Sequence, residues 1–341
     1  MDKTLGVAVV GCGTISNMHL NAIKQMKVAK LLFVCDIDVD KARKTAFEYD
    51  CKYTDDYKNL ICNPNIDIIH ILTPHYLHSE MAIEAFNAGK NVVLEKPIGI
   101  SMKDLKELNK ISDKSEPYIA VVLQNRYNPI SLYLKKVVES GEYGKLIGTK
   151  GIVAWYRSKE YYENSNWRGE WASEGGGVLI NQAIHTIDLM QWIGGKVTAV
   201  KGHIDNHYHP YIEVEDTALA TLYYDNNTVG NFYATNNNGI NSSVELEFVF
   251  EKATFVQKNE ELIKITSGDK SEVVESNCAN KGEKGYWGQG HRIYIEDAYN
   301  HILNKEKPFI TIKEALVANE IVLGIYESSK TNEKYSLNYV E

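Results

Sequence analysis

The first 123 residues alternate short apolar runs with segments of helical periodicity, and this alternation constrains the fold more than any other feature of the chain. The runs are rich in β-branched residues and occupy positions 5–10, 30–35, 66–72, 90–95 and 118–123. Apolar side chains recur at helical spacing in 19–27, 41–49, 79–89 and 101–113. Near-continuous apolar strands that alternate with helices predict a parallel sheet covered by helices on both faces.

The second half of the chain carries a different pattern. After a helical segment at 129–140, polar and apolar residues alternate in longer segments at 145–158, 196–205, 216–225, 228–236, 244–257 and 261–268. Such strands predict an antiparallel sheet with one solvated face. Further helices are expected at 178–193, 292–306 and 312–330. We therefore predict an α/β protein with a Rossmann dinucleotide-binding domain at 1–123. An α+β domain with a large, mostly antiparallel open sheet would follow at 124–341.

Length, charge and cysteine content narrow the functional classes. The chain has 341 residues, too many for one ordinary core, and its formal net charge of −8 argues against a nucleic-acid partner. Its apolar runs are shorter than the roughly 18 residues of a membrane span. We interpret the N-terminal run as a strand and not as a signal peptide. Five cysteines without a CxxC pair favour reduced thiols and therefore a cytoplasmic location.

A glycine-rich loop follows the first apolar run. In VVGCGTIS, Gly11 would permit a tight turn and Gly13 would let the backbone approach a pyrophosphate. The amides of Thr14 and Ile15 would open the next helix, whose N-terminus favours negative charge. Ser16 stands where the fingerprint has its third glycine, which mainly serves helix–strand packing. Alone, such a loop is a weak indication of a dinucleotide site.

A carboxylate at the end of the second apolar run strengthens this interpretation. Asp36 follows the loop by about 20 residues, where an acidic side chain binds the hydroxyls of the adenosine ribose. Ile37 comes next and no arginine is adjacent, so a 2′-phosphate would be repelled. The sequence therefore predicts NAD as the cofactor in preference to NADP.

An ammonium group follows the apolar run at 90–95. In VVLEKPIG, Lys96 lies at the carboxyl end of a predicted parallel strand, where such sheets bind their ligands. Oxidation of a secondary alcohol removes a hydride from carbon and a proton from oxygen. A lysine beside the hydroxyl would stabilise the developing alkoxide. A histidine would be a suitable base, because its ordinary pKa lies near neutral pH.

With its EKP tripeptide at 95–97, the chain resembles the Gfo/Idh/MocA family, the relatives of glucose-fructose oxidoreductase and inositol dehydrogenase. The resemblance covers essentially the whole chain. The segments that carry it are 73–97 (TPHYLHSEMAIEAFNAGKNVVLEKP), 124–129 (QNRYNP), 166–171 (NWRGEW), 175–192 (GGGVLINQAIHTIDLMQW) and 286–297 (YWGQGHRIYIED). Each segment is modest evidence alone, whereas their order along the chain makes the resemblance specific.

The resemblance implies roles for three residues. Lys96 matches the family's catalytic lysine, which is expected to hydrogen-bond the substrate hydroxyl beside the nicotinamide. His185 matches the histidine of the helical motif and would be the acid/base. Asn181 precedes His185 by one helical turn and would share its face. Many relatives have an aspartate at this position. Asn181 cannot titrate, so proton transfer would fall to His185, and a substrate assignment borrowed from inositol dehydrogenases is weakened.

Further residues are expected on the two sides of a site between the domains. The expected cofactor contacts are Gly11, Gly13, Thr14, Ile15, Asp36, Thr73, Pro74, His78, Glu95, Lys96, Gln124 and Arg168. The expected substrate contacts are Lys96, Arg126, Tyr127, Tyr156, Trp167, Asn181, His185 and Tyr286. Aromatic faces with polar tips suit a sugar, although tyrosine is also common in sheets.

Three histidines outside these motifs suggest a metal site. His203, His207 and His209 fall at a strand end and turn, without the convergent spacing that zinc ligands need. We therefore expect a solvated loop and no metal. Structural roles also compete with the catalytic ones, because Lys96 could be a surface lysine and His185 a core histidine.

These observations predict an NAD-dependent dehydrogenase that acts on a secondary hydroxyl of a sugar, glycoside, cyclitol or nucleotide sugar. Its partners would be that small molecule and further copies of the chain, in a homo-oligomer (a dimer or tetramer), with no nucleic acid and no membrane. One alternative is an enzyme that cleaves a glycoside by transient oxidation and recycles NAD, so that no NADH accumulates. Another is a non-catalytic NAD-binding regulator, although the presence of both Lys96 and His185 argues against it.

Overall fold

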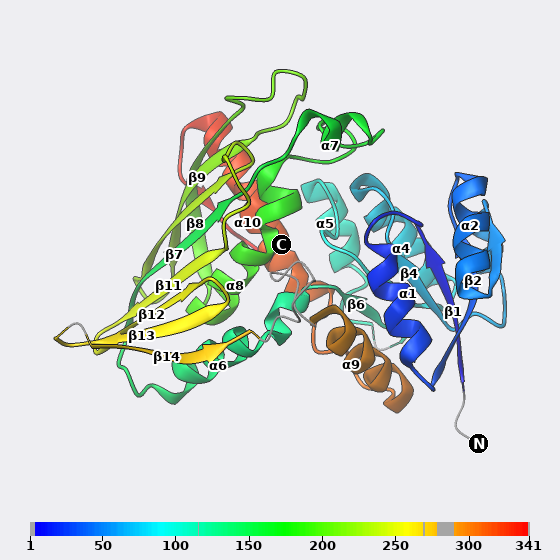
Figure 1. The fold of residues 1–341 in the computed structure, drawn as a ribbon, viewed down its shortest axis with the longest axis horizontal. Coiled ribbons are helices and arrows are strands. Elements are labelled where there is room, and N and C mark those ends of the chain that lie inside the picture. Colours follow the sequence, from blue (N-terminus) through cyan, green and yellow to red (C-terminus); the bar gives the residue numbers. More distant parts are fainter. Residues whose placement is uncertain (1–3, 115, 269, 278–289, 340–341) are drawn as a thin grey trace. The chain divides into compact units, whose positions relative to one another are not determined.

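The computed structural model describes residues 4–114, 116–268, 270–277 and 290–339 and divides into two compact units (Figure 1). The first unit comprises Met1–Gly99, Lys103–Leu123 and His291–Ala315, and the second comprises Ile100–Met102, Gln124–Gly290 and Leu316–Glu341. The segment His291–Ala315, which the sequence analysis assigned to the second domain, thus belongs to the first unit. Hydrogen bonds explain this, because Val121 N donates to Ile310 O and Tyr299 OH lies 2.7 Å from His70 Nε2.

The first unit is built on a six-stranded sheet in which every pair is parallel. Its strands are β1 (Leu5–Val10), β2 (Ala29–Cys35), β3 (Lys52–Thr54), β4 (Ile68–Ile71), β5 (Asn91–Leu94) and β6 (Ile119–Val121). Their order, β3-β2-β1-β4-β5-β6, is that of a Rossmann fold and confirms the predicted class. The helices are α1 (Ser16–Gln25), α2 (Val39–Tyr49), α3 (Lys58–Ile61), η1 (His75–Leu77), α4 (His78–Asn87), α5 (Met102–Asn109) and α9 (Gly290–Asn304).

The second unit is built on a nine-stranded sheet of order β14-β13-β12-β11-β7-β10-β9-β8-β15. Its strands are β7 (Leu146–Ala154), β8 (Val197–Asp205), β9 (Thr217–Tyr224), β10 (Val229–Thr235), β11 (Glu245–Phe250), β12 (Ala253–Lys258), β13 (Glu261–Thr266), β14 (Lys270–Ser276) and β15 (Tyr335–Ser336). Only the β7–β10 pair is parallel among these strands, so the sheet is mostly antiparallel, as predicted. The helices are η2 (Gln124–Tyr127), α6 (Pro129–Ser140), α7 (Lys159–Glu163), η3 (Val178–Ala183), α8 (Ile184–Gly194) and α10 (Ile312–Thr331).

The structure departs from the sequence pattern in several places. Residues 244–257, expected as one strand, form the hairpin of β11 and β12, because Glu251 and Lys252 make a turn between them. The alternation hides this turn, since Phe250 and Ala253 are both buried. The helix expected at 178–193 begins as a π-helix, η3, and becomes α-helical only at Ile184. Neither β3 nor β14 was predicted.

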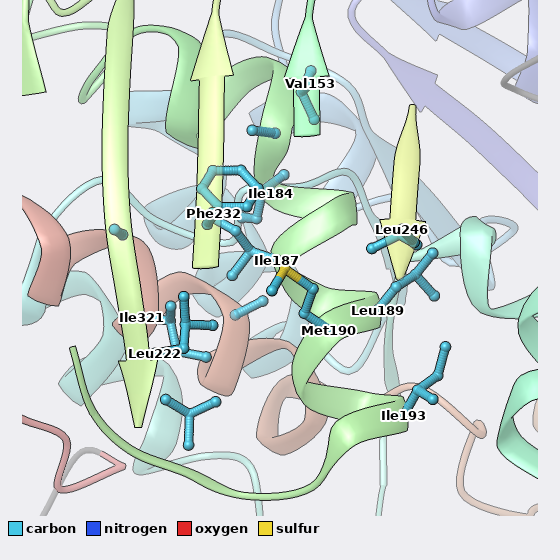
Figure 2. Close-up of a cluster of buried hydrophobic side chains, with 14 of the residues drawn as sticks. Val153, Ile184, Ile187, Leu189, Met190, Ile193, Leu222, Phe232, Leu246 and Ile321 are labelled. Atoms are coloured by element: carbon cyan, nitrogen blue, oxygen red, sulfur yellow. The ribbon is translucent and has the colours of Figure 1, made fainter. Parts of the chain in front are cut away.

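One face of the second sheet is covered by α8 and α10. Figure 2 shows Ile187 and Met190 of α8 gathered with Phe232 of β10 and Ile321 of α10. The helix can approach closely because β7 has a glycine at the contact: a Cβ on Gly151 would lie 2.5 Å from the sulfur of Met190. Along β7, β9 and β10, buried residues alternate with half-buried or exposed ones. This is the pattern of a sheet with one covered and one solvated face. In the part of the chain that the structure describes, none of the helices is long and apolar enough to span a membrane.

The helix–sheet contact should be sensitive to volume at Ile187, which is fully buried. Ile187→Ala removes buried methyl groups and leaves a cavity, so the free energy of unfolding should fall by about 2–5 kcal/mol. Ile187→Val removes less and should cost about 0.5–1.5 kcal/mol. Urea unfolding of both variants measures the difference. Equal losses in the two variants would contradict close packing at this contact.

Candidate active site

The cofactor-side candidates of the first unit gather at one edge of its sheet. The glycine loop follows β1, Asp36 follows β2, Thr73 and Pro74 follow β4, and Lys96 follows β5. These four strands are parallel, so their carboxyl ends lie on the same edge. The strand order also reverses direction between β1 and β4, which is where such sheets form a ligand crevice.

The glycine loop has the shape that a pyrophosphate needs. Gly11 has a φ of +96°, and a Cβ there would lie 2.5 Å from the carbonyl oxygen of Leu72. A Cβ on Gly13 would meet nothing within 4 Å, so this stretch of backbone is open to an approaching ligand. Ser16 donates from Oγ to Gly13 O at 2.7 Å and thereby replaces the missing glycine with a loop contact. The first turn of α1 follows directly, with no side-chain cap from Ile15.

Asp36 is held against this loop by backbone donors. Its Oδ2 accepts from Cys12 N at 2.9 Å, and its Oδ1 accepts from Asp38 N at 3.0 Å. Each carboxylate oxygen can accept a second hydrogen bond, so the group remains suited to ribose hydroxyls. Ile37 is 86% exposed and carries no charge to bind a 2′-phosphate. The arrangement therefore fits NAD.

His78 supports the loops beside Lys96. It is buried, with Nδ1 2.6 Å from Pro97 O and Nε2 2.8 Å from Thr73 O. Burial lowers the pKa of His78, so the ring is neutral at pH 7 and its single N–H donates to one of the two carbonyls. The half-buried residues here are Thr73, Pro74 and Lys96. The buried ring of His78 lies between the backbone carbonyls of Thr73 and Pro97 and so links the two segments.

Glu95 is a buried anion directly before Lys96. Its Oε1 accepts from His19 Nε2 at 2.9 Å and lies 3.5 Å from His291 Nε2, and its Oε2 accepts from Lys96 N at 3.2 Å. Burial opposes this charge, but hydrogen bonds from the two histidines outweigh it and hold the pKa of Glu95 well below its usual range. Glu95 therefore braces the loop of Lys96 from inside the unit.

The histidines around Glu95 could also hold a metal ion, since one nitrogen each of His19 and His291 and one oxygen of Glu95 lie within 4.8 Å of one another. A hydrogen-bond chain explains the cluster in a simpler way. If His19 Nε2–H donates to Glu95, its Nδ1 accepts from His70, and His70 Nε2 accepts from Tyr299 O–H. Burial lowers the pKa of both His19 and His70, which suits the neutral rings that this chain needs. The expectation of no metal stays a prediction.

The substrate-side candidates of the second unit lie on η3 and α8. Within Val178–Met190, Asn181 and His185 are the two residues that are not buried. This shared exposure agrees with the expected common face. The π-helix changes the spacing on which that expectation was based, because its hydrogen bonds skip one more residue than those of an α-helix.

A buried glutamate holds the start of this helix. Glu215 accepts from Gly177 N at 2.7 Å and from Leu179 N at 3.0 Å, while Tyr326 OH donates to it at 3.0 Å. Burial raises the pKa of Glu215 to about 7. Gly177 is required there, because a Cβ would collide with the carbonyl oxygen of Glu215. The last glycine of the triple-glycine segment therefore binds the Glu215 carboxylate through its backbone N–H.

A second buried glutamate contacts Asn181 itself. Asn181 Nδ2 donates to Glu174 Oε1 at 2.6 Å and lies 3.3 Å from Tyr161 OH, which also accepts from Gln182 Nε2 at 3.1 Å. The guanidinium of Arg168 lies 4.4 Å from the centroid of the Tyr161 ring. Burial raises the pKa of Tyr161, so its hydroxyl stays protonated.

Comparisons with known proteins identify the domains that carry these residues. Residues 5–122 match the model of an oxidoreductase family with an NAD-binding Rossmann fold, and residues 131–256 match the GFO/IDH/MocA C-terminal domain. The chain belongs to the Gfo/Idh/MocA family. The first unit is thus the family's NAD-binding domain, which confirms the predicted cofactor.

Several relatives carry names that describe their reactions. The chain is 26% identical to the scyllo-inositol 2-dehydrogenase (NAD(+)) of Bacillus subtilis over 73% of this chain and 72% of that protein. It is 28% identical to the WlbA dehydrogenase of Bordetella pertussis, solved with NADH and UDP-GlcNAcA, with a TM-score of 0.88 over 99% of each chain. A levoglucosan dehydrogenase solved with NADH and levoglucosan shares the fold, with a TM-score of 0.89 at 21% identity over 98% of this chain and 99% of that one.

Not every relative is matched over its full length. The chain spans 62% and 65% of the length of two oxidoreductases that it matches, from Synechocystis sp. and Bacillus subtilis. Both matches have 28% identity. The family and the cofactor follow from the matched domains, whereas the substrate requires an argument of its own.

One expected substrate contact, Arg126, forms a buried ion pair inside the second unit. Arg126 is 1% exposed, and its Nε and Nη2 donate to the two oxygens of Asp188 at 2.8 and 2.7 Å. This bidentate pair joins η2 to α8 inside the second unit. Gln124 is buried in the same short helix.

The remaining candidates differ in exposure. Tyr156 is exposed, and Tyr127, Trp167 and Arg168 are half-buried. Tyr286 lies outside the described residues.

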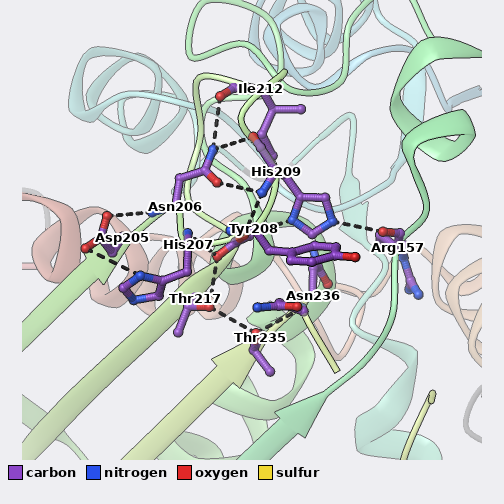
Figure 3. A network of polar contacts seen from close by, with 12 residues as sticks. Arg157, Asp205, Asn206, His207, Tyr208, His209, Ile212, Thr217, Thr235 and Asn236 are labelled. Atoms are coloured by element: carbon purple, nitrogen blue, oxygen red, sulfur yellow. Dashed lines mark hydrogen bonds and ion pairs between the residues drawn. The ribbon is translucent and has the colours of Figure 1, made fainter. Parts of the chain in front are cut away.

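The histidine-rich turn is not the solvated loop that we expected. His209 is fully buried, with Nδ1 2.8 Å from Asp216 Oδ2 and Nε2 2.9 Å from Arg157 O (Figure 3). Burial opposes the imidazolium of His209, yet the bonds to Asp216 and Arg157 outweigh it and raise its pKa. The same hydrogen bond from His209 holds the pKa of Asp216 below its usual range despite burial. His203 and His207 are exposed, as expected.

Sequence reasoning missed the residues that support the family motifs. These are His19, Glu174 and Glu215, all buried. Glu174 had a weak signal, because it directly precedes the triple glycine. Glu215 had none beyond an acidic residue before a strand, and His19 resembled a surface position of an amphipathic helix. Their importance depends on distant partners that no local pattern reveals.

The preference for NAD should depend on Asp36. The double change Asp36→Ser with Ile37→Arg removes the carboxylate and adds a cation for the 2′-phosphate, so preference should shift toward NADP. Titration of both cofactors into parent and variant measures this. Tighter binding of NADP than of NAD by the unmodified protein would contradict the role of Asp36.

Proposed function

We propose that this protein is an NAD-dependent dehydrogenase that oxidises a secondary hydroxyl of a sugar, glycoside, cyclitol or nucleotide sugar. The observation that carries the proposal is two groups of residues within the family motifs, one group in each unit. Lys96 is braced by a buried anion at the carboxyl edge of the NAD-binding sheet. Asn181 and His185 are the accessible residues of an otherwise buried helical stretch, Val178–Met190. The names of the relatives, which mention scyllo-inositol, UDP-GlcNAcA and levoglucosan, support a polyhydroxylated substrate.

The chemistry divides between the cofactor and the side chains. Bound NAD, held by the glycine loop and Asp36, supplies the acceptor for the hydride. Lys96 donates a hydrogen bond to the reacting oxygen and stabilises the negative charge that develops there. His185 accepts the hydroxyl proton, because neutral imidazole is a base near physiological pH. Asn181 orients a neighbouring hydroxyl without taking up a proton.

The exposed face of the second unit's sheet suggests self-association. It carries a hollow of about 480 Å³ whose lining includes Ile152, Leu219 and Tyr233 together with Lys201 and Asn231. Leu219, one of the lining residues, is an exposed leucine, which favours a protein contact. We propose that copies of the chain pair through this face. We also propose a cytoplasmic setting, because the four described cysteines are free thiols and would remain reduced there.

A single screen tests the reaction. Free sugars, anhydrosugars, inositols and nucleotide sugars are incubated with the protein and NAD, and NADH is followed by absorbance. Formation of NADH with one of these classes is the expected result. Substrate loss without net NADH would favour the NAD-recycling alternative. NAD binding with no consumption of any compound would favour a regulator.

Lys96 should be needed for turnover and not for cofactor binding. Lys96→Ala should lower kcat by about 10² or more, because the lysine acts mainly on the developing alkoxide. Affinity for NAD should stay close to that of the parent. Lys106→Ala, which changes an exposed lysine on α5, is the control and should behave like the parent. Normal turnover by Lys96→Ala would show that the assignment is wrong.

His185 should account for the alkaline rise in kcat/KM. With saturating NAD, the parent should show one dominant basic limb, and His185→Ala should lose it and keep only slow turnover. His207→Ala changes an exposed histidine elsewhere in the second unit and should leave the limb in place. If the limb persists in His185→Ala, the base is another group, and Lys96 becomes the candidate.

A further inference from the structure

The amide of Asn181 has one possible orientation, and a buried carboxylate determines it. Its Nδ2 lies 2.6 Å from Glu174 Oε1 and 3.3 Å from Tyr161 OH. A carboxylate only accepts hydrogen bonds, so nitrogen and not oxygen must face Glu174. Nδ2 faces Glu174 and Tyr161, so Oδ1, an acceptor with two lone pairs, lies at the other end of the amide.

Glu174 is itself held in place. It is 1% exposed, and its second oxygen, Oε2, accepts from the backbone N–H of Gly169 at 2.6 Å. That backbone has little freedom, because Gly169 has a φ of +87° and a Cβ there would lie 2.9 Å from Ile212. The two oxygens of Glu174 thus join a fixed main-chain donor to the side chain of Asn181.

Two guanidinium groups lie beside the Tyr161 ring that contacts Asn181. The Tyr161 ring has the guanidinium of Arg168 at 4.4 Å and that of Arg157 at 5.2 Å from its centroid. The cluster therefore combines a buried anion, a neutral amide, a protonated phenol and two cations within the second unit.

We propose that Glu174 is the positioning residue of the substrate site: it fixes Asn181 so that position 181 presents a hydrogen-bond acceptor to a substrate hydroxyl. The inference rests on the proposed function, because it assigns Asn181 to a polyhydroxylated substrate. It also gives the site a carboxylate although position 181 itself is an asparagine. The carboxylate is present, but it stands one hydrogen bond behind the residue that faces the substrate.

The pairing makes a simple restoration of aspartate unfavourable. In Asn181→Asp, two carboxylates would meet at the present 2.6 Å contact. Like charges at that distance cannot both ionise, so the pair would share a proton or separate. The exchange of amide and carboxylate, Glu174→Gln with Asn181→Asp, keeps the charge and restores a donor opposite an acceptor.

Glu174→Gln alone has a different defect. The introduced glutamine would need its oxygen for the fixed Gly169 N–H, so its amide nitrogen would face Asn181. Asn181 would then turn over and present Nδ2, a donor, to the substrate. KM should rise and kcat/KM should fall by about 10- to 100-fold, because a substrate donor would meet a donor.

The experiment compares four proteins: the parent, Glu174→Gln, Asn181→Asp and the exchanged double variant. Steady-state kinetics use each compound that yields NADH with the parent, and NAD affinity is measured separately. Both single variants should lose about 10-fold or more in kcat/KM, the double variant should return to within about 3-fold of the parent, and NAD affinity should stay within about 2-fold throughout. Glu163→Gln, an exposed glutamate on α7, is the matched control and should behave like the parent.

If the double variant loses kcat/KM by the product of the two single-variant losses, the proposal is overturned. Unchanged kinetics in Glu174→Gln would also overturn it. If Glu174→Gln does not fold, the comparison of Asn181→Asp with the double variant still decides, since the second change must restore what the first removed.

A measurement without substrate distinguishes a failure of this inference from a failure of the proposed function. Urea unfolding of the same four proteins should show unfolding constants raised about 10-fold in each single variant and restored in the double variant. If the screen finds no substrate, the dehydrogenase proposal fails, whereas this cycle still confirms or overturns the pairing. If the increase in the double variant equals the product of the two single-variant increases, Glu174 does not fix Asn181.

Discussion

Buried carboxylates hold the functional loops of this protein, and most of the site geometry depends on them. Glu95 receives hydrogen bonds from His19 and from the backbone of Lys96. Glu215 accepts from two amides at the start of the π-helix, and Glu174 accepts from a loop amide and from Asn181. A buried carboxylate is unfavourable unless donors surround it. Each loop therefore has to present its N–H groups, and this requirement fixes the backbone that carries the neighbouring functional residue.

The fold could largely be predicted from the sequence, because its pattern is local. Apolar runs that alternate with helices indicate a parallel sheet, and one-sided alternation indicates an antiparallel one. The hairpin of β11 and β12 escaped this reasoning, since the residues on either side of its turn are both buried. The π-helix escaped it as well, because no periodicity distinguishes Val178–Ala183 from an ordinary first turn.

The sequence predicts those site residues whose chemistry follows from a local motif. It does not predict residues whose role depends on a partner that is distant in the sequence. The glycine loop, Asp36 and Lys96 stand at strand ends and could be placed from their neighbours in sequence. Arg126 belongs to a motif and looked like a ligand for the substrate, yet it pairs with Asp188, 62 positions away. His209 likewise is buried by its bond to Asp216 and the carbonyl of Arg157. Long-range pairing of this kind follows from tertiary structure alone.

The discontinuity of the first unit has a consequence for the order in which the protein is made. Its sheet is complete by residue 123, but His291 and Tyr299 arrive only with α9. Until that helix has been synthesised, Glu95 lacks one of its histidines and His70 lacks the hydroxyl beside it. A nascent chain must therefore produce almost all of the second unit before the first can close its buried hydrogen-bond chain, and the nucleotide-binding half, although first in sequence, is among the last parts to be finished.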